Sequence, residues 1–283
     1  MRVIWVLENI HNDKGFYGKF NLLLLLASVT LWKKNHPKHH TVFYCDQLTH
    51  DTVTKLGGIH LWDEIVIYEH TLPIKRDVFW ACNKVKVVSE QTEPFIIMDN
   101  DTLVFKPFHD LLKEDVLVAN LETGKGYYPG NIDKYVKQLS NRVRWQQDSL
   151  NVSFLYFPDP EVSKLYGNWS LEMMQEFSKM NVPNSQYLIF SEQLLLRWIL
   201  DNHKINYKSI IATYWDCNKW DWGENHDKGI WPFPESELYF KHYGPGKKYV
   251  LKDGTDLGYE GECELLENCI NIRNLDYSHI QNK

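Results

Sequence analysis

The stretch Phe95–Phe105, FIIMDNDTLVF, places two aspartates two residues apart between two apolar runs. The run FIIM predicts a buried strand, and Asp99 and Asp101 follow it directly. Residues two apart on an extended chain point to the same side, so the two carboxylates repel each other unless a cation joins them. Mg²⁺ or Mn²⁺, shared with a substrate phosphate, suits such oxygen ligands. The alternative is that Asp and Asn simply favour a turn here.

The chain before this stretch alternates between uncharged β-rich runs and helical patterns. Such alternation predicts an α/β fold with a mainly parallel sheet flanked by helices. Ligands of such sheets bind outside the carboxyl ends of the strands, which is where Asp99 and Asp101 lie. The expected strands cover residues 3–7, 41–45, 64–68 and 95–98, and the expected helices cover 15–34, 51–56 (closed by Gly57-Gly58) and 77–89.

The second half of the chain is less regular. We expect a strand over 151–157 (NVSFLYF), a helix over 162–179, and a helix from Glu192 to about Asn202 with Ser191 as its N-cap. Residues 214–243 are rich in Trp, Pro and Asp with weak periodicity, which predicts loops that carry aromatic side chains. These aromatics could form a platform for an acceptor sugar, a lid, or part of the core.

Composition and charge limit the class of protein. A net charge of −6 and a pI near 6.1 give no basic field for nucleic acid or anionic membrane. Five cysteines without a CxxC pair favour reduced thiols and a cytoplasmic protein. The run Phe20–Trp32 is too short to span a bilayer and predicts a buried helix, so no transmembrane segment is expected. The histidines 36, 39 and 40 are expected on the surface.

Two segments far apart in the chain together resemble one enzyme family. FIIMDNDTLVF is similar to the metal-binding DxD segment of GT-A glycosyltransferases. Phe240–Lys248, FKHYGPGKK, resembles the HxxGxxKPW segment of the glycogenin-like and lipopolysaccharide-galactosyltransferase-like retaining family. His242 falls on the metal-ligand histidine of that segment and Lys248 on its diphosphate-binding lysine. The segment departs from the pattern in its early glycine, Gly244, and in Tyr-Val in place of Pro-Trp.

Other segments follow the order of the same family. Tyr17 stands where the family has a tyrosine near the base and ribose, and Lys84 resembles its donor-binding basic residue. Asn151–Leu155 (NVSFL) resembles its N-[AS]-G-V-[LM] strand, and SEQL, which contains Glu192 and Gln193, resembles its DQxxLN segment. The resemblance therefore implies catalytic roles for Glu192, Gln193 and Lys248, metal binding by Asp99, Asp101 and His242, and nucleotide-sugar binding by Tyr17, Lys84, Asp99, Asn100, Asn151, Gly246 and Lys248.

The resemblance implies a metal-dependent, retaining glycosyltransferase with a single GT-A domain. Its nucleotide-binding half would cover about 1–105, its sugar and acceptor half about 106–250, and a C-terminal extension 251–283. Mn²⁺, or Mg²⁺, would be the cofactor, a UDP-sugar the favoured donor, and a glycan or other hydroxyl compound the acceptor. Two alternatives stay open: a phosphatase of the haloacid-dehalogenase type that uses Asp99 as nucleophile and Asp101 as acid–base, and a GT-A-like carbohydrate-binding module without turnover.

Overall fold

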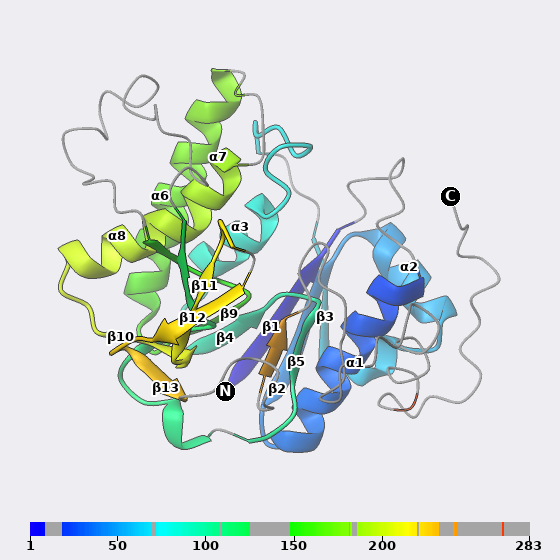
Figure 1. Ribbon diagram of the computed structural model, residues 1–283. Helices are drawn as coiled ribbons and strands as arrows, with labels where there is room; N and C mark the ends of the chain where they lie inside the picture. Colours follow the sequence, from blue (N-terminus) through cyan, green and yellow to red (C-terminus); the bar gives the residue numbers. More distant parts are fainter. Residues whose placement is uncertain are drawn as a thin grey trace. The chain divides into compact units, whose positions relative to one another are not determined.

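The computed structural model divides the chain into two compact units (Figure 1). Unit 1 comprises Met1–Glu69, Met98–Leu111 and Glu235–Lys283, and unit 2 comprises His70–Ile97 and Leu112–Pro234. Within these units the structure describes residues 1–8, 19–68, 72–107, 109–124, 148–180, 182, 186–219, 221–231, 240–242 and 268. Each unit is described by itself below.

Unit 1 contains a parallel arrangement of strands that alternate with helices, as the sequence predicts. Strand β2 pairs in parallel with both β1 and β3. Gly57 follows α2 with a φ of 74°, the left-handed conformation that ends many helices and that glycine adopts without strain. The elements of this part are β1 (Arg2–Leu7), α1 (Lys19–Asn35), β2 (His40–Cys45), α2 (Gln47–Lys55), a 3₁₀ turn (Ile59–Leu61) and β3 (Glu64–Ile67).

Helix α1 is buried over most of its length. Its leucines from Leu22 to Leu26 are all almost inaccessible to solvent, which confirms the predicted buried helix. No helix among the described residues is long and apolar enough to cross a membrane. The prediction for the histidines was wrong in part: His36 is fully buried and its ring stacks on Trp32, with ring centroids 4.1 Å apart, while His40 is exposed. The aromatic stack offsets the polarity of the imidazole.

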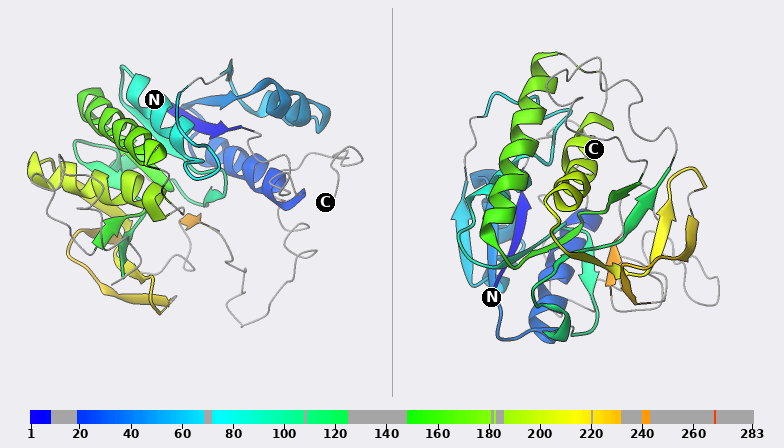
Figure 2. Two further views of the ribbon diagram at one scale, coloured as in Figure 1. Left: turned by 90° about the horizontal axis from the view of Figure 1, so that it is seen from above. Right: turned by 90° about the vertical axis from the view of Figure 1, so that its left-hand side faces the viewer.

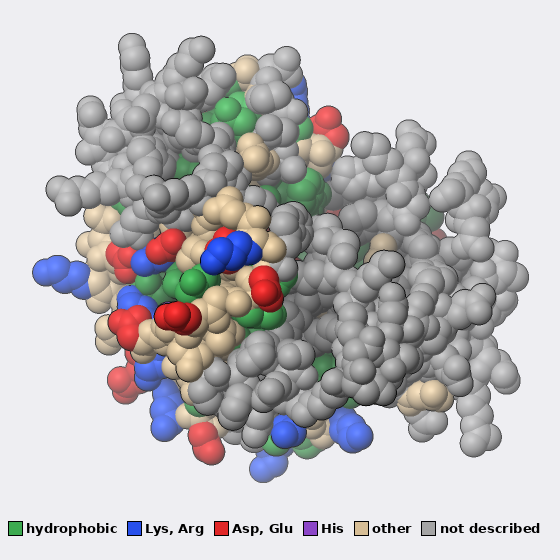
Figure 3. Space-filling view, viewed as in Figure 1, with side chains coloured by type: hydrophobic (Ala, Val, Ile, Leu, Met, Phe, Trp, Pro, Cys, Tyr) green, Lys and Arg blue, Asp and Glu red, His purple; other side chains and the backbone are tan. Residues whose placement is uncertain are grey.

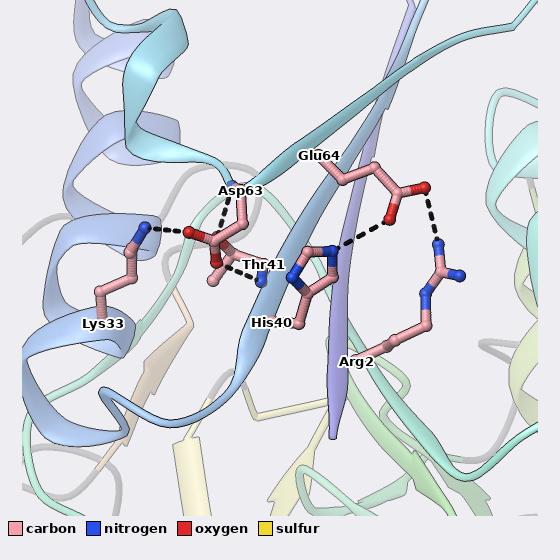
Figure 4. Close-up of polar contacts among 6 residues, drawn as sticks. All are labelled: Arg2, Lys33, His40, Thr41, Asp63 and Glu64. Carbon is pink, nitrogen blue, oxygen red and sulfur yellow. Dashed lines mark hydrogen bonds and ion pairs between the residues drawn. The ribbon is translucent and has the colours of Figure 1, made fainter.

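A polar cluster joins the amino ends of these strands to α1 (Figure 4). Lys33 Nζ lies 2.7 Å from Asp63 Oδ1, and the backbone N–H and the hydroxyl of Thr41 both donate to Asp63 Oδ2 at 2.8 Å. Burial raises the pKa of Asp63, but the bonds from Lys33 and Thr41 outweigh it and lower the pKa to about 2. Asp63 therefore stabilises unit 1 as a carboxylate.

Unit 2 contains two sheets. In the first, β10 pairs in parallel with β6 and β13, and β6 pairs antiparallel with β9; in the second, the strand order is β12-β11-β7-β8. The strands are β4 (Phe95–Met98, whose last residue falls in unit 1), β6 (Val116–Val118), β7 (Leu121–Thr123), β8 (Asp148–Leu150), β9 (Phe154–Phe157), β10 (Tyr207–Ile211), β11 (Thr213–Asp216), β12 (Asp221–Asn225) and β13 (Gly229–Trp231).

Helices α3 (Cys82–Glu90) and α6 (Pro160–Lys179) lie side by side in unit 2 (Figure 2). They approach closely at Gly167, where an added Cβ would lie only 2.6 Å from Cβ of Ser89. Asp159 caps α6 by accepting from the Glu161 N–H at 2.9 Å. The remaining helical part runs through α7 (Gln186–Ile189), a π-helical turn (Phe190–Leu194) and α8 (Leu195–Asn202).

The structure corrects what the sequence predicts for the strands in the second half of the chain. Residues 214–243 contain strands β11, β12, β13 and β14 (Phe240–His242) rather than loops alone. The strand expected over 151–157 is confirmed at Phe154–Phe157, where β9 lies, but it begins three residues late, because residues 151–153 separate β8 from β9. The weak periodicity has a physical cause: β11 and β12 are short, joined by a turn and irregular in register, and both faces carry polar or aromatic side chains.

Candidate active site

The acidic pair lies in a turn that is anchored within unit 1. Asp99 and Asp101, both half-buried, precede β5 (Thr102–Val104), and the Thr102 N–H donates to the Asp99 carbonyl at 3.1 Å. Asn100, between them, donates through Nδ2 to the Val6 carbonyl of β1 at 3.1 Å. Asn100 therefore ties the turn to the carboxyl end of β1, which supports the site edge expected from the sequence.

Strand β5 is also fixed to helix α1. The Ser28 hydroxyl donates to the Thr102 carbonyl at 2.6 Å, and the buried indole N–H of Trp5 donates to the Ser28 oxygen at 2.9 Å. Asn35 Nδ2 donates to the Val104 carbonyl at 2.8 Å. These bonds pair the polar groups of Trp5, Ser28 and Asn35 with one another or with the backbone of β5. The strand that follows the two aspartates is therefore held rigidly.

Strand β14 places the backbone of His242, the predicted third metal ligand, next to the turn that carries Asp99 and Asp101. It pairs antiparallel with β5, and His242 lies opposite Thr102, the residue after Asp101. The side chain of His242 is outside the described part of the structure, as are Tyr17, Gly246 and Lys248. Within the ranges that the structure describes, no group of three or more His, Cys, Asp or Glu side chains is placed to hold a metal. The backbone register nevertheless fits the predicted metal ligands.

A further acid, Glu8, lies at the carboxyl end of β1, and no role was predicted for it from the sequence. Its side chain is only 6% exposed. Burial of the thiol, and then the charges of Asp46 and Glu8, raise the pKa of Cys45 to about 12, so negative charge gathers at the ends of β1 and β2. The signal in the sequence was a carboxylate directly after an uncharged strand.

Unit 2 holds a buried ion pair between two of the predicted residues. Lys84 Nζ, on α3, lies 2.9 Å from Glu192 Oε1, and the two side chains are 11% and 9% exposed. The same ammonium donates to the Val152 carbonyl at 2.9 Å. The structure therefore brings together Lys84, Glu192 and the segment that begins at Asn151.

Glu192 and Gln193 lie in a π-helical turn. The predicted N-cap at Ser191 was wrong: the helix begins earlier, and the Ser191 hydroxyl donates back to the Tyr187 carbonyl at 2.7 Å. π-helical turns cost hydrogen-bond geometry and occur often at functional sites. Gln193 Oε1 is buried and has no hydrogen-bond partner among the described residues. The same is true of Nδ2 of Asn83, the residue before Lys84. Such unmet groups cost about 1–3 kcal/mol each unless a ligand satisfies them.

Asn151 is fixed by both ends of its amide. Its Nδ2 donates to Glu122 Oε1 at 2.6 Å, and its Oδ1 accepts from the Ser153 N–H at 3.0 Å. Asn151 and Glu122 are 3% and 8% exposed. Glu122 was not predicted from the sequence, because it lies 29 residues before Asn151 and in no recognised motif.

The one described Ser–His contact in this part of the fold does not form an activated nucleophile. His226 Nδ1 accepts from the Lys228 N–H at 3.3 Å, so Nε2 carries the proton and donates to the Ser209 oxygen at 3.0 Å. The Ser209 hydroxyl donates in turn to the Ile211 carbonyl at 2.8 Å. A catalytic base would instead accept the serine proton, so this pair is structural.

Comparisons with known proteins agree with the fold predicted from the sequence. Residues 63–250 match a family described as "Family of unknown function (DUF6734)". No curated protein matches the chain. A structure of galactosyltransferase LgtC in complex with donor and acceptor sugar analogs is 11% identical, with a TM-score of 0.51, and a structure of an active-site mutant of LgtC is also 11% identical, with a TM-score of 0.54. Each match covers 99% of this chain and 100% of the other.

At this identity the likeness establishes the fold. The chain has the predicted GT-A fold, α/β with a mainly parallel central sheet flanked by helices, and the resemblance to the lipopolysaccharide-galactosyltransferase-like family is confirmed at that level.

Proposed function

This chain belongs to the DUF6734 family, whose function is unknown, and we propose that it is a metal-dependent glycosyltransferase. It would move a sugar from a nucleotide-diphosphate donor, with a UDP-sugar favoured, to a hydroxyl acceptor, with retention at the anomeric carbon. The observation that carries the proposal is the register of β14 on β5, which sets His242 opposite the residue after Asp101. The two most specific motifs of the resemblance are 140 residues apart in the chain, and the pairing of β14 with β5 makes them neighbours.

The metal half of the proposed site belongs to unit 1. Asp99, Asp101 and His242 would hold Mn²⁺, because imidazole beside carboxylates suits Mn²⁺ better than Mg²⁺. A bound divalent ion neutralises charge that develops on a departing diphosphate. Lys248 and Gly246 would bind the same phosphates, and Tyr17 the nucleoside; these three assignments rest on the resemblance. Asn100 holds the aspartate turn on β1 through its bond to the Val6 carbonyl.

The sugar half of the proposed site belongs to unit 2. Lys84 pairs with Glu192 at 2.9 Å and holds its carboxylate in place, and the remaining lone pairs of that carboxylate can accept hydrogen bonds from sugar hydroxyls. The buried amide oxygen of Gln193 can accept another, and Asn151 is oriented by Glu122. These groups bind and orient a sugar in a water-poor environment, where their charges act strongly.

The two alternatives make different demands. A phosphatase would use Asp99 as a nucleophile and would have no role for the pairing of β14 with β5 or for the buried Lys84–Glu192 pair. A carbohydrate-binding module without turnover would bind sugar through unit 2 and leave the acids of unit 1 unused. A cytoplasmic location remains a prediction.

Nucleotide release separates these functions. The purified chain would be incubated with a panel of UDP-, GDP- and CDP-sugars in Mn²⁺ and then in EDTA, since many transferases slowly hydrolyse a donor when no acceptor is present. We expect metal-dependent release of one nucleotide. Cleavage of a simple phosphoester with no cleavage of any donor would instead establish the phosphatase, and saturable sugar binding without cleavage would establish the binding module.

A further inference from the structure

Two tryptophans form the outer end of a row across the second sheet of unit 2. Trp222 on β12 pairs directly with Trp215 on β11, and Trp215 pairs with Glu122 on β7. Neighbours in register across a sheet point to the same face, so these three side chains form one row, here named the Trp row. The indole rings meet edge to face with centroids 5.4 Å apart.

The Trp row runs from an edge strand towards the predicted sugar site. Trp222 and Trp215 are half-buried, whereas Glu122 is 8% exposed. Glu122 accepts from Asn151, and Val152, the next residue, accepts from Lys84. The aromatic surface therefore leads, within unit 2, to the residues proposed to hold the donor sugar. Strands β11 and β12 lie next to each other in Figure 1.

The opposite face of the hairpin fixes the position of Trp222. Gly223 has no side chain, and the ring of Tyr214 lies against it so closely that an added Cβ would be 2.0 Å from a ring atom. Tyr214 alternates with Trp215 along β11 and therefore covers the other face. The hairpin is thus packed on its Tyr214 face, which presents the Trp row in a fixed orientation.

Glu122 has unused hydrogen-bonding capacity at the inner end of the row. One carboxylate oxygen, Oε1, accepts from Asn151, and the second has no hydrogen-bond or ion-pair partner in the part of the chain that the structure describes. This second oxygen is not among the fully buried side-chain atoms that lack a partner, so it keeps some exposure through which a ligand can reach it. A donor delivered by a ligand would satisfy it.

We propose that the Trp row is the acceptor site and that it binds a neutral pyranose. A pyranose ring offers a face of C–H groups that packs on the indole surface of Trp222 and Trp215, and hydroxyls at its edge that donate to the second carboxylate oxygen of Glu122. This inference rests on the proposed transferase function, for which it names the class of acceptor. It assigns the hydroxyl nearest Glu122 as the one directed at the donor sugar.

The charges around the row favour a neutral sugar over an anionic one. Glu122 is itself a member of the row, whereas Asp216 and Asp221 follow and precede the two tryptophans in their strands and so face the opposite side of the sheet. The described cation of the hairpin, Lys219, pairs with Asp216 at 3.5 Å. The carboxylate of Glu122 is therefore the charge that a sugar on the row would meet. Figure 3 shows acidic and basic side chains beside hydrophobic ones over the region that β11 and β12 occupy. A uronic or sialic acid would be repelled there.

The competing reading is that the Trp pair only stabilises the hairpin, as cross-strand aromatic pairs do. Saturation-transfer-difference NMR distinguishes the two, with methyl β-D-glucopyranoside and methyl β-D-galactopyranoside as probes and glucuronic acid as the charged comparison. The variants are Trp222→Leu and, because it keeps the side-chain volume, Glu122→Gln. Trp169→Leu is the matched control, since Trp169 is also half-buried and also stacks on a tryptophan, Trp198, but lies on α6.

We expect the wild-type chain to bind a neutral pyranoside saturably and to bind glucuronic acid at least fivefold more weakly. Binding of the neutral pyranoside should be at least tenfold weaker in Trp222→Leu and Glu122→Gln and unchanged in Trp169→Leu. Circular dichroism would establish that each variant is folded. Wild-type affinity in both variants, or no saturable binding to the wild-type chain, would overturn the proposal. Nucleotide release is measured in parallel on the wild-type chain: release without pyranoside binding refutes only the acceptor site, and binding at the Trp row without release refutes only the transferase.

Discussion

Replacing Lys84 by methionine would remove the ammonium that faces the buried carboxylate of Glu192. In the wild-type protein the two charges lie 2.9 Å apart at 11% and 9% exposure. Breaking one partner of a buried pair costs about 3–5 kcal/mol. The loss of stability in Lys84→Met cannot exceed the cost of protonating Glu192 instead, which for a carboxyl of ordinary pKa about 4.3 is about 3.7 kcal/mol at pH 7. We therefore expect Lys84→Met to lower the free energy of unfolding by about 3 kcal/mol at pH 7.

The pH dependence of this loss has a definite sign. In Lys84→Met, burial raises the folded-state pKa of Glu192 above its unfolded value, so the folded state binds more protons. The destabilisation relative to wild type is then small near pH 4.3 and grows as the pH rises through the folded-state pKa. The double variant Lys84→Met/Glu192→Leu removes both charges and should recover most of the stability, although not the binding of the donor.

Urea unfolding at pH 5 and pH 7 measures these effects for the wild type, both single variants and the double variant. A loss under about 1 kcal/mol in Lys84→Met, a loss that does not change with pH, or a double variant as unstable as the sum of the singles would refute the reasoning, because each would show that the two charges are not energetically coupled.

Three further predictions concern stability. Asp63→Asn should remove about 1 kcal/mol of the free energy of unfolding, a small amount because partial exposure screens the pair of Asp63 with Lys33. The bonds from Lys33 and Thr41 lower the Asp63 pKa, so the wild type has this stability above pH 4 and loses it as the pH falls towards about 2. Acid unfolding curves measure the difference, and identical curves for the two proteins below pH 4 would contradict it. Burial lowers the pKa of His226, so the stability that neutral His226 contributes is present above about pH 6.5 and is lost at lower pH. His226→Gln should therefore weaken the dependence of the free energy of unfolding on pH between pH 5 and 7, measured by urea unfolding. An unchanged pH dependence would count against this. Gly167→Ala should lower the thermal midpoint and cost about 2 kcal/mol, because its Cβ would meet Ser89 at 2.6 Å; a stabilised variant would disprove the close packing of α3 on α6.

The sequence predicted best those elements whose pattern is local. Strands β1 to β4 are short apolar runs between turn signals, with a charged residue only at the first position of β1 and of β3, and α1 and α6 have long apolar stripes, so the pattern of apolar residues alone identifies them. The helix boundary at Ser191 failed because a serine that bonds back to the i−4 carbonyl within a helix has the same sequence signature as an N-cap.

The candidate site was predicted where motifs carry it and missed where only the fold creates it. The register of β14 on β5 supports the pairing of Asp101 with His242 that the resemblance implies. Glu122 could not be found, because its partner Asn151 is distant in the chain and only the strand pairing of β7 with β8 brings them together. The sequence offered the aromatics of residues 214–243 as an acceptor platform, a lid or core, and it could not show which of them become neighbours, because side chains from three strands meet only in the sheet.

In the proposed transferase, the acids after β4 hold a metal that enables release of a nucleotide from a sugar donor. The most direct measurement compares nucleotide release and Mn²⁺ binding, the latter by electron paramagnetic resonance, in the wild type, Asp101→Asn and the control Asp110→Asn, an exposed acid of the same unit. The account predicts that Asp101→Asn loses Mn²⁺ binding and at least a hundredfold of nucleotide release, while Asp110→Asn keeps both. Undiminished metal-dependent release in Asp101→Asn would contradict it.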